Sequence, residues 1–182
     1  MKQQAIGLTP EERWEKHTPQ INQAQIKKSI MNVVLFEPEI PANTGNISRT
    51  CAITGAALHL IEPLGFDISE KAVRRAGLDY WDKLDLYVYP NWQNFLAQNP
   101  AANIYLSTTK GSVHYTKMQY QPNDYLVFGK ETAGLPDYIR GAYADHCIRI
   151  PMGKEFRSLN LSNAVAIVLY EALRQNQFFD LD

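Results

Sequence analysis

The chain has 182 residues, 45% of them hydrophobic, which suits one globular domain with an ordinary core. With 18 Lys and Arg against 19 Asp and Glu, the net charge is −1, so any nucleic-acid binding must use a local basic patch rather than a global excess. Two distant cysteines, no apolar leader and no apolar run long enough to span a membrane predict a reduced, cytoplasmic protein without a disulfide framework or zinc site.

Residues 1–30 differ in composition from the rest, being rich in Gln, Lys and Glu. Thr9-Pro10-Glu11-Glu12 is typical of a helix start, with Pro at the first position and acids in the first turn, and predicts a short helix to about His17. The segment is too small to form its own core. We therefore expect an appendage over 1–30 and one domain over 31–182, with Met31 as a possible alternative start.

Strand and helix patterns then alternate along the chain. The predicted strands are Met31–Phe36, Leu58–Ile61, Leu84–Val88, Ile104–Leu106, Tyr125–Phe128 and Cys147–Ile150. The first predicted helix begins at Asn43 and ends at Gly55. Four further helices are predicted over Glu70–Ala76, Asn91–Gln98, Pro136–Ala142 and Ala164–Gln175. This alternation predicts an α/β fold, a mostly parallel six-stranded sheet with helices on both faces.

Ligands of such sheets collect beyond the carboxyl ends of the strands. The candidate loops are therefore Pro38–Arg49, Ser107–Gly111, Gly129–Pro136 and Met152–Asn160. The sequence has no G-x-G-x-x-G after a strand, no P-loop, no G-x-S-x-G elbow and no H-E-x-x-H. The four histidines are scattered and predict no metal site, so the common nucleotide-binding, hydrolase and zinc-protease classes are disfavoured.

Two of these loops carry polar groups suited to a site. Asn43, Asn46 and Arg49 gather at a helix start, where free N–H groups favour anions and a guanidinium binds phosphate in fork geometry. A capped helix with a solvated Arg explains the same spacing. Gly129 and Glu131 follow the fifth strand, where Glu131 could orient a hydroxyl or an amide, and a turn with a solvated Glu is the alternative.

The stretch before the last helix is the most polar of these junctions. Arg157, Ser158 and Asn160 precede Ser162 and Asn163, at the start of a helix that is apolar on nearly every side. Capping by Ser162 or Asn163 explains one of these residues but not the whole group. The basic stretch Lys71, Arg74 and Arg75, near Tyr80 and Trp81, could follow a phosphate backbone or could be a solvated helix face.

Together, three of these loops resemble the ordered motifs of the SPOUT RNA methyltransferases. They are Asn43–Arg49, Phe128–Pro136 and Ile150–Ala164. Glu37–Pro41 and Arg74–Tyr80 narrow the resemblance to the small members that methylate the 2′-oxygen of cytidine or uridine 34 in tRNA. The resemblance covers about 31–174. Lys130 and Ala133 fill places that vary in the family, where they could alter RNA contact.

The resemblance implies properties that the residue patterns do not give. It implies a C-terminal trefoil knot, which general rules of chain topology would have rejected. It also implies a homodimer, in agreement with the apolar last helix, which requires burial on more than one side. The implied partner is tRNA, and no membrane is involved.

The resemblance further implies S-adenosylmethionine as the cofactor, without a metal. By the family pattern the cofactor contacts Ser107, Gly129, Ile150, Met152 and Ser158. Around the ribose the family pattern places five residues as catalytic: Asn43, Arg49, Glu131, Ser158 and Asn160. Arg49 has been assigned as the base in related enzymes, but a guanidinium stays protonated in proteins, so phosphate positioning suits it better. RNA contacts are expected from Arg49, Lys71, Arg74, Arg75 and Arg157.

The predicted function is therefore methylation of the ribose 2′-hydroxyl at nucleotide 34 of tRNA, with tRNA-Leu as the expected substrate. One alternative is the same chemistry at another tRNA or rRNA position. The other is an RNA-binding dimer without catalysis, which the presence of Asn43, Arg49, Glu131 and Asn160 disfavours.

Overall fold

The apolar segments form a sheet in the computed structural model, which describes residues 30–67 and 83–181. Its strands are β1 (Asn32–Phe36), β2 (Ala57–Ile61), β3 (Leu86–Tyr89), β4 (Ile104–Ser107), β5 (Val113–His114), β6 (Tyr125–Gly129) and β7 (Cys147–Arg149). The α-helices are α2 (Pro41–Thr54), α4 (Trp92–Gln98), α5 (Asp137–Ala142) and α6 (Leu161–Gln175). Short 3₁₀ helices are η2 (Tyr115–Lys117), η3 (Ala144–His146) and η4 (Gln177–Asp180).

The strands lie in the order β3-β2-β1-β6-β4-β7-β5, and every pairing is parallel. The predicted α/β class and parallel sheet are confirmed, but the predicted number of six strands is wrong, because the described residues form seven. The additional strand, β5, has only two residues, and His114 in it is exposed. No apolar run marks so short a strand in the sequence; it exists because Val113 and His114 pair with Ile148 and Arg149 of β7.

The predicted helix ends need small corrections. Helix α2 begins at Pro41, two residues before the expected Asn43, with Pro in its first turn, and ends at Gly55 as predicted, with φ 71°. Helix α6 begins at Leu161, three residues before Ala164. The predicted helices over 9–17 and 70–76, and all of the appendage except Ile30, lie outside the described residues.

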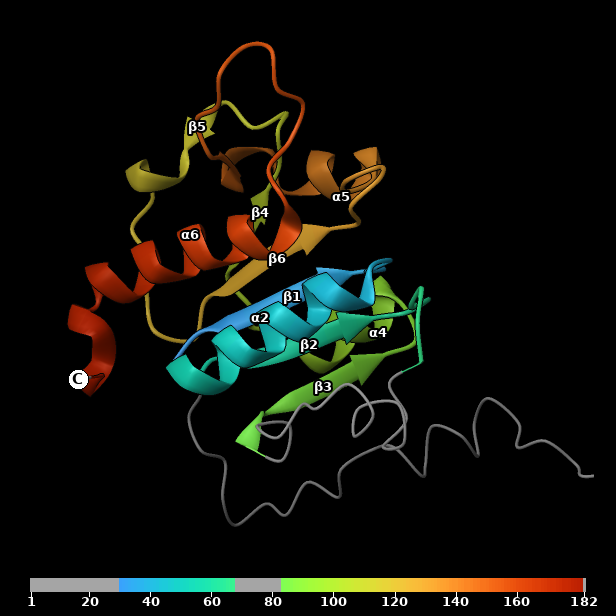
Figure 1. The fold of residues 1–182 in the computed structure, drawn as a ribbon, viewed down its shortest axis with the longest axis vertical. Coiled ribbons are helices and arrows are strands. Elements are labelled where there is room, and N and C mark those ends of the chain that lie inside the picture. Colours follow the sequence, from blue (N-terminus) through green and yellow to red (C-terminus); the bar gives the residue numbers. More distant parts are fainter. Residues whose placement is uncertain (1–29, 68–82, 182) are drawn as a thin grey trace, which may run out of the picture.

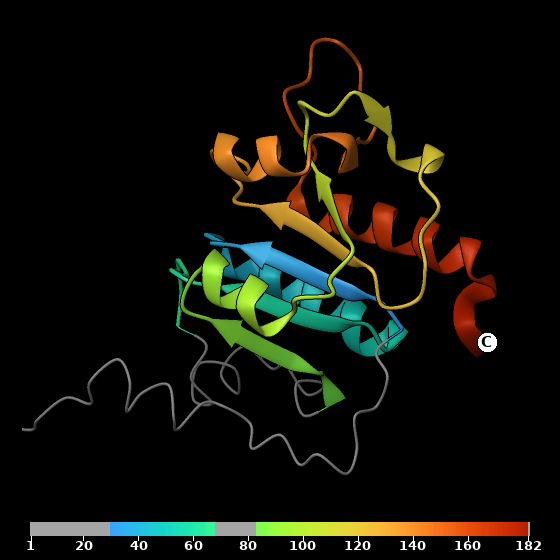
Figure 2. The same ribbon diagram turned by 180° about the vertical axis from the view of Figure 1, so that it is seen from behind.

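Helices cover both faces of the sheet (Figures 1 and 2). Helices α2 and α6 pack on one face, where Ile47, Cys51 and Val168 meet alternate strand residues. Helices α4 and α5 pack on the other, where Phe95 and Ile139 meet the residues in between. This two-sided burial explains why the central strands are continuous apolar runs. In the part of the chain that the structure describes, no helix is long and apolar enough to cross a membrane.

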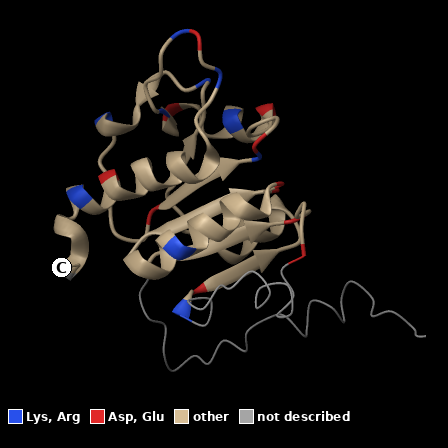
Figure 3. Cartoon of the chain, in the orientation of Figure 1, with Lys and Arg blue, Asp and Glu red and all other residues tan. Residues whose placement is uncertain are grey.

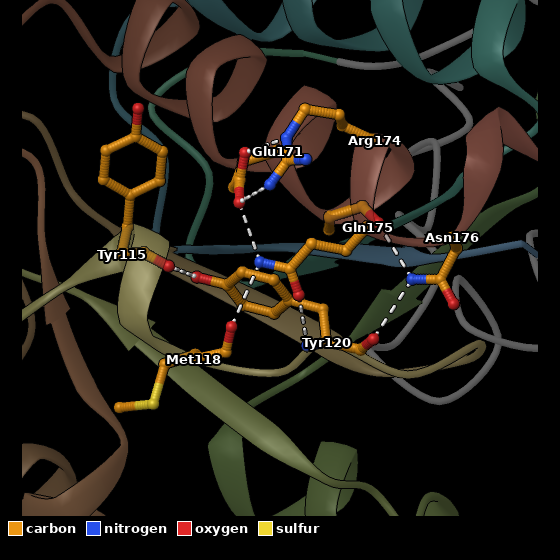
Figure 4. Close-up of polar contacts among 8 residues, drawn as sticks. Tyr115, Met118, Tyr120, Glu171, Arg174, Gln175 and Asn176 are labelled. Atoms are coloured by element: carbon orange, nitrogen blue, oxygen red, sulfur yellow. Dashed lines mark hydrogen bonds and ion pairs between the residues drawn. The ribbon is translucent and has the colours of Figure 1, made fainter.

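The end of α6 is tied to the segment that follows η2 (Figure 4). The Tyr120 N–H donates to Gln175 Oε1 at 3.0 Å, and Gln175 Nε2 donates to the Met118 carbonyl at 3.1 Å. Asn176 Nδ2 donates to the Tyr120 carbonyl at 3.1 Å, and the buried Tyr120 hydroxyl donates to the Tyr115 carbonyl at 2.7 Å. Side chains at the end of α6 thus replace the strand partners that the 118–121 backbone lacks.

Candidate active site

Four strand-end loops meet in one pocket of about 430 Å³. Strands β1, β6, β4 and β7 are neighbours and parallel, so the loops after their carboxyl ends converge at one edge of the sheet. The lining comes from Ile40 and Asn43, from 107–110, from 128–135 with Arg140, and from Ile150, Met152, 157–161 and Ala164. All four candidate loops of the sequence contribute to it, and the volume is typical of a small-molecule site.

The loop before α2 is joined to the loop after β6 by paired charges and hydrogen bonds. Lys130 Nζ lies 2.5 Å from Glu37 Oε2, and this bond raises the pKa of Lys130. The Thr132 hydroxyl donates to Glu39 Oε2 at 2.8 Å, and its N–H donates to the same oxygen at 3.1 Å. The two loops therefore form one wall of the pocket.

Glu131 lies where these loops meet, and three donors surround it. Its carboxylate accepts from the Glu39 N–H at 2.9 Å, the Ile40 N–H at 3.2 Å and Asn43 Nδ2 at 3.0 Å. Partial burial acts to raise the pKa of Glu131, but the hydrogen bonds outweigh it and hold the pKa below its usual value. Glu131 is the only carboxylate among the described lining residues, and it is ionised and well satisfied.

Asn43 extends the contacts of Glu131 to the start of α6. Asn43 is 5% exposed, and its Oδ1 accepts from Asn160 Nδ2 at 2.9 Å. Asn160 Oδ1 in turn accepts from the N–H groups of Ser162 at 2.9 Å and Asn163 at 3.3 Å. Asn160 is thus the N-cap of α6, and the expectation that Ser162 or Asn163 caps it is wrong: α6 begins earlier, so both lie inside its first turn.

All five predicted cofactor residues line the pocket: Ser107, Gly129, Ile150, Met152 and Ser158. Gly129 lets the buried Leu135 side chain pack against the end of β6, because a Cβ on it would lie 2.4 Å from Leu135 Cδ2. Of the predicted RNA contacts, Arg157 lines the pocket. Arg49 does not; six residues beyond Asn43, it lies about 9 Å along α2 and on a different side of the helix. Lys71, Arg74 and Arg75 lie outside the described residues.

Two lining cations were not singled out from the sequence, Lys110 and Arg140. Lys110 lies in a candidate loop, so its position could have indicated its place. Arg140 donates to the Leu135 carbonyl and pairs with Asp137, which gives it a structural role in α5. Within the ranges 30–67 and 83–181, no group of three or more His, Cys, Asp or Glu could hold a metal ion.

A glycine outside the pocket supports its wall. Gly65, after β2, donates its N–H to the Pro38 carbonyl at 2.9 Å. A Cβ on Gly65 would lie 2.5 Å from the Glu39 carbonyl oxygen and 2.7 Å from Glu39 Cα. These are backbone atoms that cannot swing aside, so only glycine fits behind the loop that supplies two donors to Glu131.

Comparison with known proteins identifies the family to which the chain belongs. Residues 30–170 match the SpoU rRNA methylase family. The chain belongs to this family. The predicted resemblance to SPOUT methyltransferases, nearest to the TrmL type, is confirmed. A tRNA (cytidine(34)-2'-O)-methyltransferase of Yersinia pestis is 53% identical over 152 residues, which are 80% of this chain and 94% of that protein.

Solved structures of SpoU methylases and related enzymes share the fold. A structure from work on the 2-OH methylation of C/U34 on tRNA has a TM-score of 0.76 and 40% identity, covering 81% of this chain and 96% of that chain. The SpoU methyltransferase AviRb from Streptomyces viridochromogenes, in complex with the cofactor AdoMet, has a TM-score of 0.70 and 25% identity, covering 86% of this chain and 64% of that chain. Membership of this SpoU family makes the chain a methyltransferase.

The residues of this SpoU pocket fit S-adenosylmethionine. Backbone segments 107–110 and 128–135 border the pocket together with the apolar side chains Ile150 and Met152. That combination offers peptide hydrogen bonds and an apolar contact for a nucleoside. It also explains why no glycine-rich dinucleotide fingerprint occurs in the sequence.

Proposed function

We propose that this chain methylates the ribose 2′-hydroxyl of nucleotide 34, a cytidine or modified uridine, in tRNA, with tRNA-Leu as the expected substrate. The supporting observation is the pocket in which all four strand-end loops meet, with Asn43, Glu131 and Asn160 joined at its edge. The match to this chain covers nearly the whole length of the relatives that are named for cytidine 34. We place the reaction in the cytoplasm.

The proposed cofactor is S-adenosylmethionine, held by Ser107, Gly129, Ile150, Met152 and Ser158. When bound, it would supply a methyl group to the ribose 2′-oxygen. The electron pair of the broken carbon–sulfur bond would stay on the sulfur, and the hydroxyl proton would pass to solvent water. The protein's part is to align the two reactants and exclude competing water. We place Ser158 and the Asn43–Glu131–Asn160 group around the ribose, and Arg49 and Arg157 on the RNA phosphates.

We propose that the loop 150–160 and α6 close a trefoil knot. The family membership and the tie between the end of α6 and residues 118–121 support it. Pulling the chain from both ends in an optical trap tests the knot. A knotted chain stops short of its full contour length, whereas an extension that reaches the full length contradicts the knot.

The proposed assembly is a homodimer built on α2 and α6. These helices lie side by side, and their outer sides carry few charges (Figure 3). Ile53 of α2 is 62% exposed, and Ile167 and Tyr170 of α6 are 36% and 46% exposed. Three large apolar side chains on adjacent helices form a surface that a second copy would cover.

Incubation with labelled S-adenosylmethionine and extracted tRNA tests the proposed function. We expect label in the ribose of nucleotide 34. Label at another tRNA position or in rRNA would move the target and keep the chemistry. If the protein binds tRNA but transfers no label, and calorimetry detects no cofactor binding, the result would instead support a non-catalytic RNA-binding protein.

A further inference from the structure

Three polar side chains from three separate segments form one continuous chain of hydrogen bonds. Glu131 comes from the loop after β6, Asn43 from the first turn of α2, and Asn160 from the N-cap of α6. Asn43 is separated in sequence from Glu131 by 88 positions and from Asn160 by 117. All three line the pocket, so the chain connects the wall made by the loops before α2 and after β6 to the start of α6.

The α6 end of this chain fixes the orientation of both amides. The N–H groups of Ser162 and Asn163 can only donate, so the atom of Asn160 that faces them is Oδ1. Asn160 therefore turns its Nδ2 toward Asn43, and Asn43 must receive it with Oδ1. Asn43 Nδ2 is then left to face Glu131.

The bonds at Glu131 require the same donor-to-acceptor direction, independently of the bonds at the start of α6. The Glu39 and Ile40 N–H groups can only donate, so the Glu131 side chain must accept from them. An ionised carboxylate also accepts from Asn43 Nδ2 without competing demands. Every donor in the chain thus points from α6 toward Glu131, and neither amide can be reversed without two donors or two acceptors facing each other.

We propose that Asn160, Asn43 and Glu131 act as a one-way hydrogen-bond relay that positions the 152–160 wall of the cofactor pocket, and that none of the three accepts the 2′-hydroxyl proton. This inference rests on the proposed function. The three are positioning residues. The carboxylate of Glu131 accepts its hydrogen bonds from protein groups, and each of the two amides accepts with its oxygen on one side and donates with its nitrogen on the other. The relay holds α6 and the loop before it against the loop before α2.

The direction of the relay makes single isosteric changes at its residues harmful, and suitable pairs of changes less so. The Glu39 N–H donates to one oxygen of Glu131, and the Ile40 N–H and Asn43 Nδ2 donate to the other. In Glu131→Gln the new Nε2 therefore faces either the Glu39 N–H or both the Ile40 N–H and Asn43 Nδ2, and turning Asn43 over would oppose its Nδ2 to that of Asn160. The pair Asn43→Asp with Glu131→Gln removes the opposition between the side chains, because the new amide at position 131 donates to the new carboxylate at position 43, which also accepts from Asn160. Only the exposed 3.2 Å bond from the Ile40 N–H is lost. The pair Glu131→Gln with Asn160→Asp reverses the bonds among the three side chains, and again the Ile40 N–H is the one donor left opposed to another donor. Both pairs keep the net charge of the three residues.

The test compares Glu131→Gln, Asn43→Asp, Asn160→Asp and the two pairs with the natural protein. Calorimetric titration with S-adenosylmethionine and thermal unfolding are both measured without RNA. We expect each single change to weaken cofactor binding about 10- to 100-fold, the effect of losing one charge-assisted hydrogen bond. We expect each pair to recover most of that loss and to unfold at a higher temperature than the singles.

The pH dependence of methyl transfer separates positioning from proton transfer. We expect the first pair to transfer methyl with the pH profile of the natural protein. A pair no better than the sum of its single changes would overturn the relay. So would a loss of rate at low pH, the acidic limb that a general base produces, if it disappears with Glu131→Gln. If the natural protein neither binds the cofactor nor methylates tRNA, the proposed function fails. The unfolding temperatures of singles and pairs still decide the relay in that case.

Discussion

His59 shows how a single residue ties folding to pH. It lies on β2, 3% exposed, and its ring nitrogens contact the Tyr89 hydroxyl at 2.9 Å and Asn32 Oδ1 at 3.1 Å. Tyr87 stacks on the ring with centroids 4.8 Å apart. Burial lowers the pKa of His59 to about 3, so the folded protein keeps the ring neutral at pH values where the unfolded chain protonates it.

Acid is therefore expected to destabilise the fold through His59. The unfolded state takes up the proton below about pH 6.5 and the folded state only near 3, so this contribution is complete above 6.5 and is lost as the pH falls. The slope is about 1.4 kcal/mol per pH unit. Urea unfolding at pH 7.5, 6 and 5 measures it, with His59→Gln as the comparison. Equal losses in the two proteins would exclude His59 as the source.

Residue types indicated the site better than they indicated the role of each residue in it. The sequence placed Asn43, Glu131 and Asn160 in strand-end loops. It left a capped helix or a solvated turn as the alternative for Asn43 and Glu131, and the family resemblance placed all three around the ribose. The sequence could not assign the α6 cap, because Asn160, Ser162 and Asn163 are all good caps and the choice depends on where the helix begins. In the structure Asn160 caps the helix with its Oδ1 while its Nδ2 is bound to Asn43, 117 residues away, a contact that no local pattern predicts.

The loop before α6 is the element most suited to RNA contact. A turn closes where the Phe156 N–H donates to the Gly153 carbonyl at 3.1 Å, and Phe156 is 73% exposed between Lys154 and Arg157. Arg157 lines the pocket, and Phe156 directly precedes it in the chain. An exposed ring between cations is typical of base stacking beside a phosphate backbone.

Replacing the ring tests that element. We expect Phe156→Ala to weaken tRNA binding about 5- to 150-fold, the loss of one stacked base, with little change in cofactor affinity. Phe178→Ala, an exposed ring beyond the far end of α6, serves as the matched control. Arg157→Gln should reduce the salt dependence of binding by about one unit of log–log slope. Unchanged tRNA affinity in Phe156→Ala would remove the loop from the RNA surface.

The tie at the end of α6 predicts a loss of stability. Gln175→Ala leaves the Tyr120 N–H and the Met118 carbonyl without their side-chain partner, which costs about 1–3 kcal/mol of the free energy of unfolding for a buried group. Chemical denaturation measures the change. Arg174→Ala, one residue earlier, removes only an exposed ion pair with Glu171 and should have a much smaller effect. Equal losses in both variants would show that the tie contributes nothing specific.

At the scale of the whole molecule, the alternation of strands and helices was enough to predict where the pocket lies. Parallel strands end at the same edge, so four loops separated by up to about a hundred residues had to converge there. The pattern could not supply β5, because two residues carry no periodicity, and it could not supply the order of the strands. That order arises when β6 is inserted between β1 and β4.

The proposed dimer surface is also a property of the whole molecule. We expect Tyr170→Glu to convert a dimer into a monomer in analytical ultracentrifugation, because a charge would then be buried between the two copies. Tyr138→Glu is the matched control, since Tyr138 is 59% exposed on α5, over the opposite face of the sheet. A natural protein that sediments as a monomer at micromolar concentration would contradict the homodimer.

Gly65 has a consequence for genetics. Since a methyl group there would press on the Glu39 backbone from behind, Gly65→Ala should loosen the Glu131 wall without altering any residue of the pocket. Heat would widen the defect, so the substitution is expected to behave as a conditional allele: nucleotide 34 is methylated in cells grown cool and undermethylated in cells grown warm. Methylation mapping at two growth temperatures would reveal it. A screen for such alleles should recover changes at this position although it lies outside every motif.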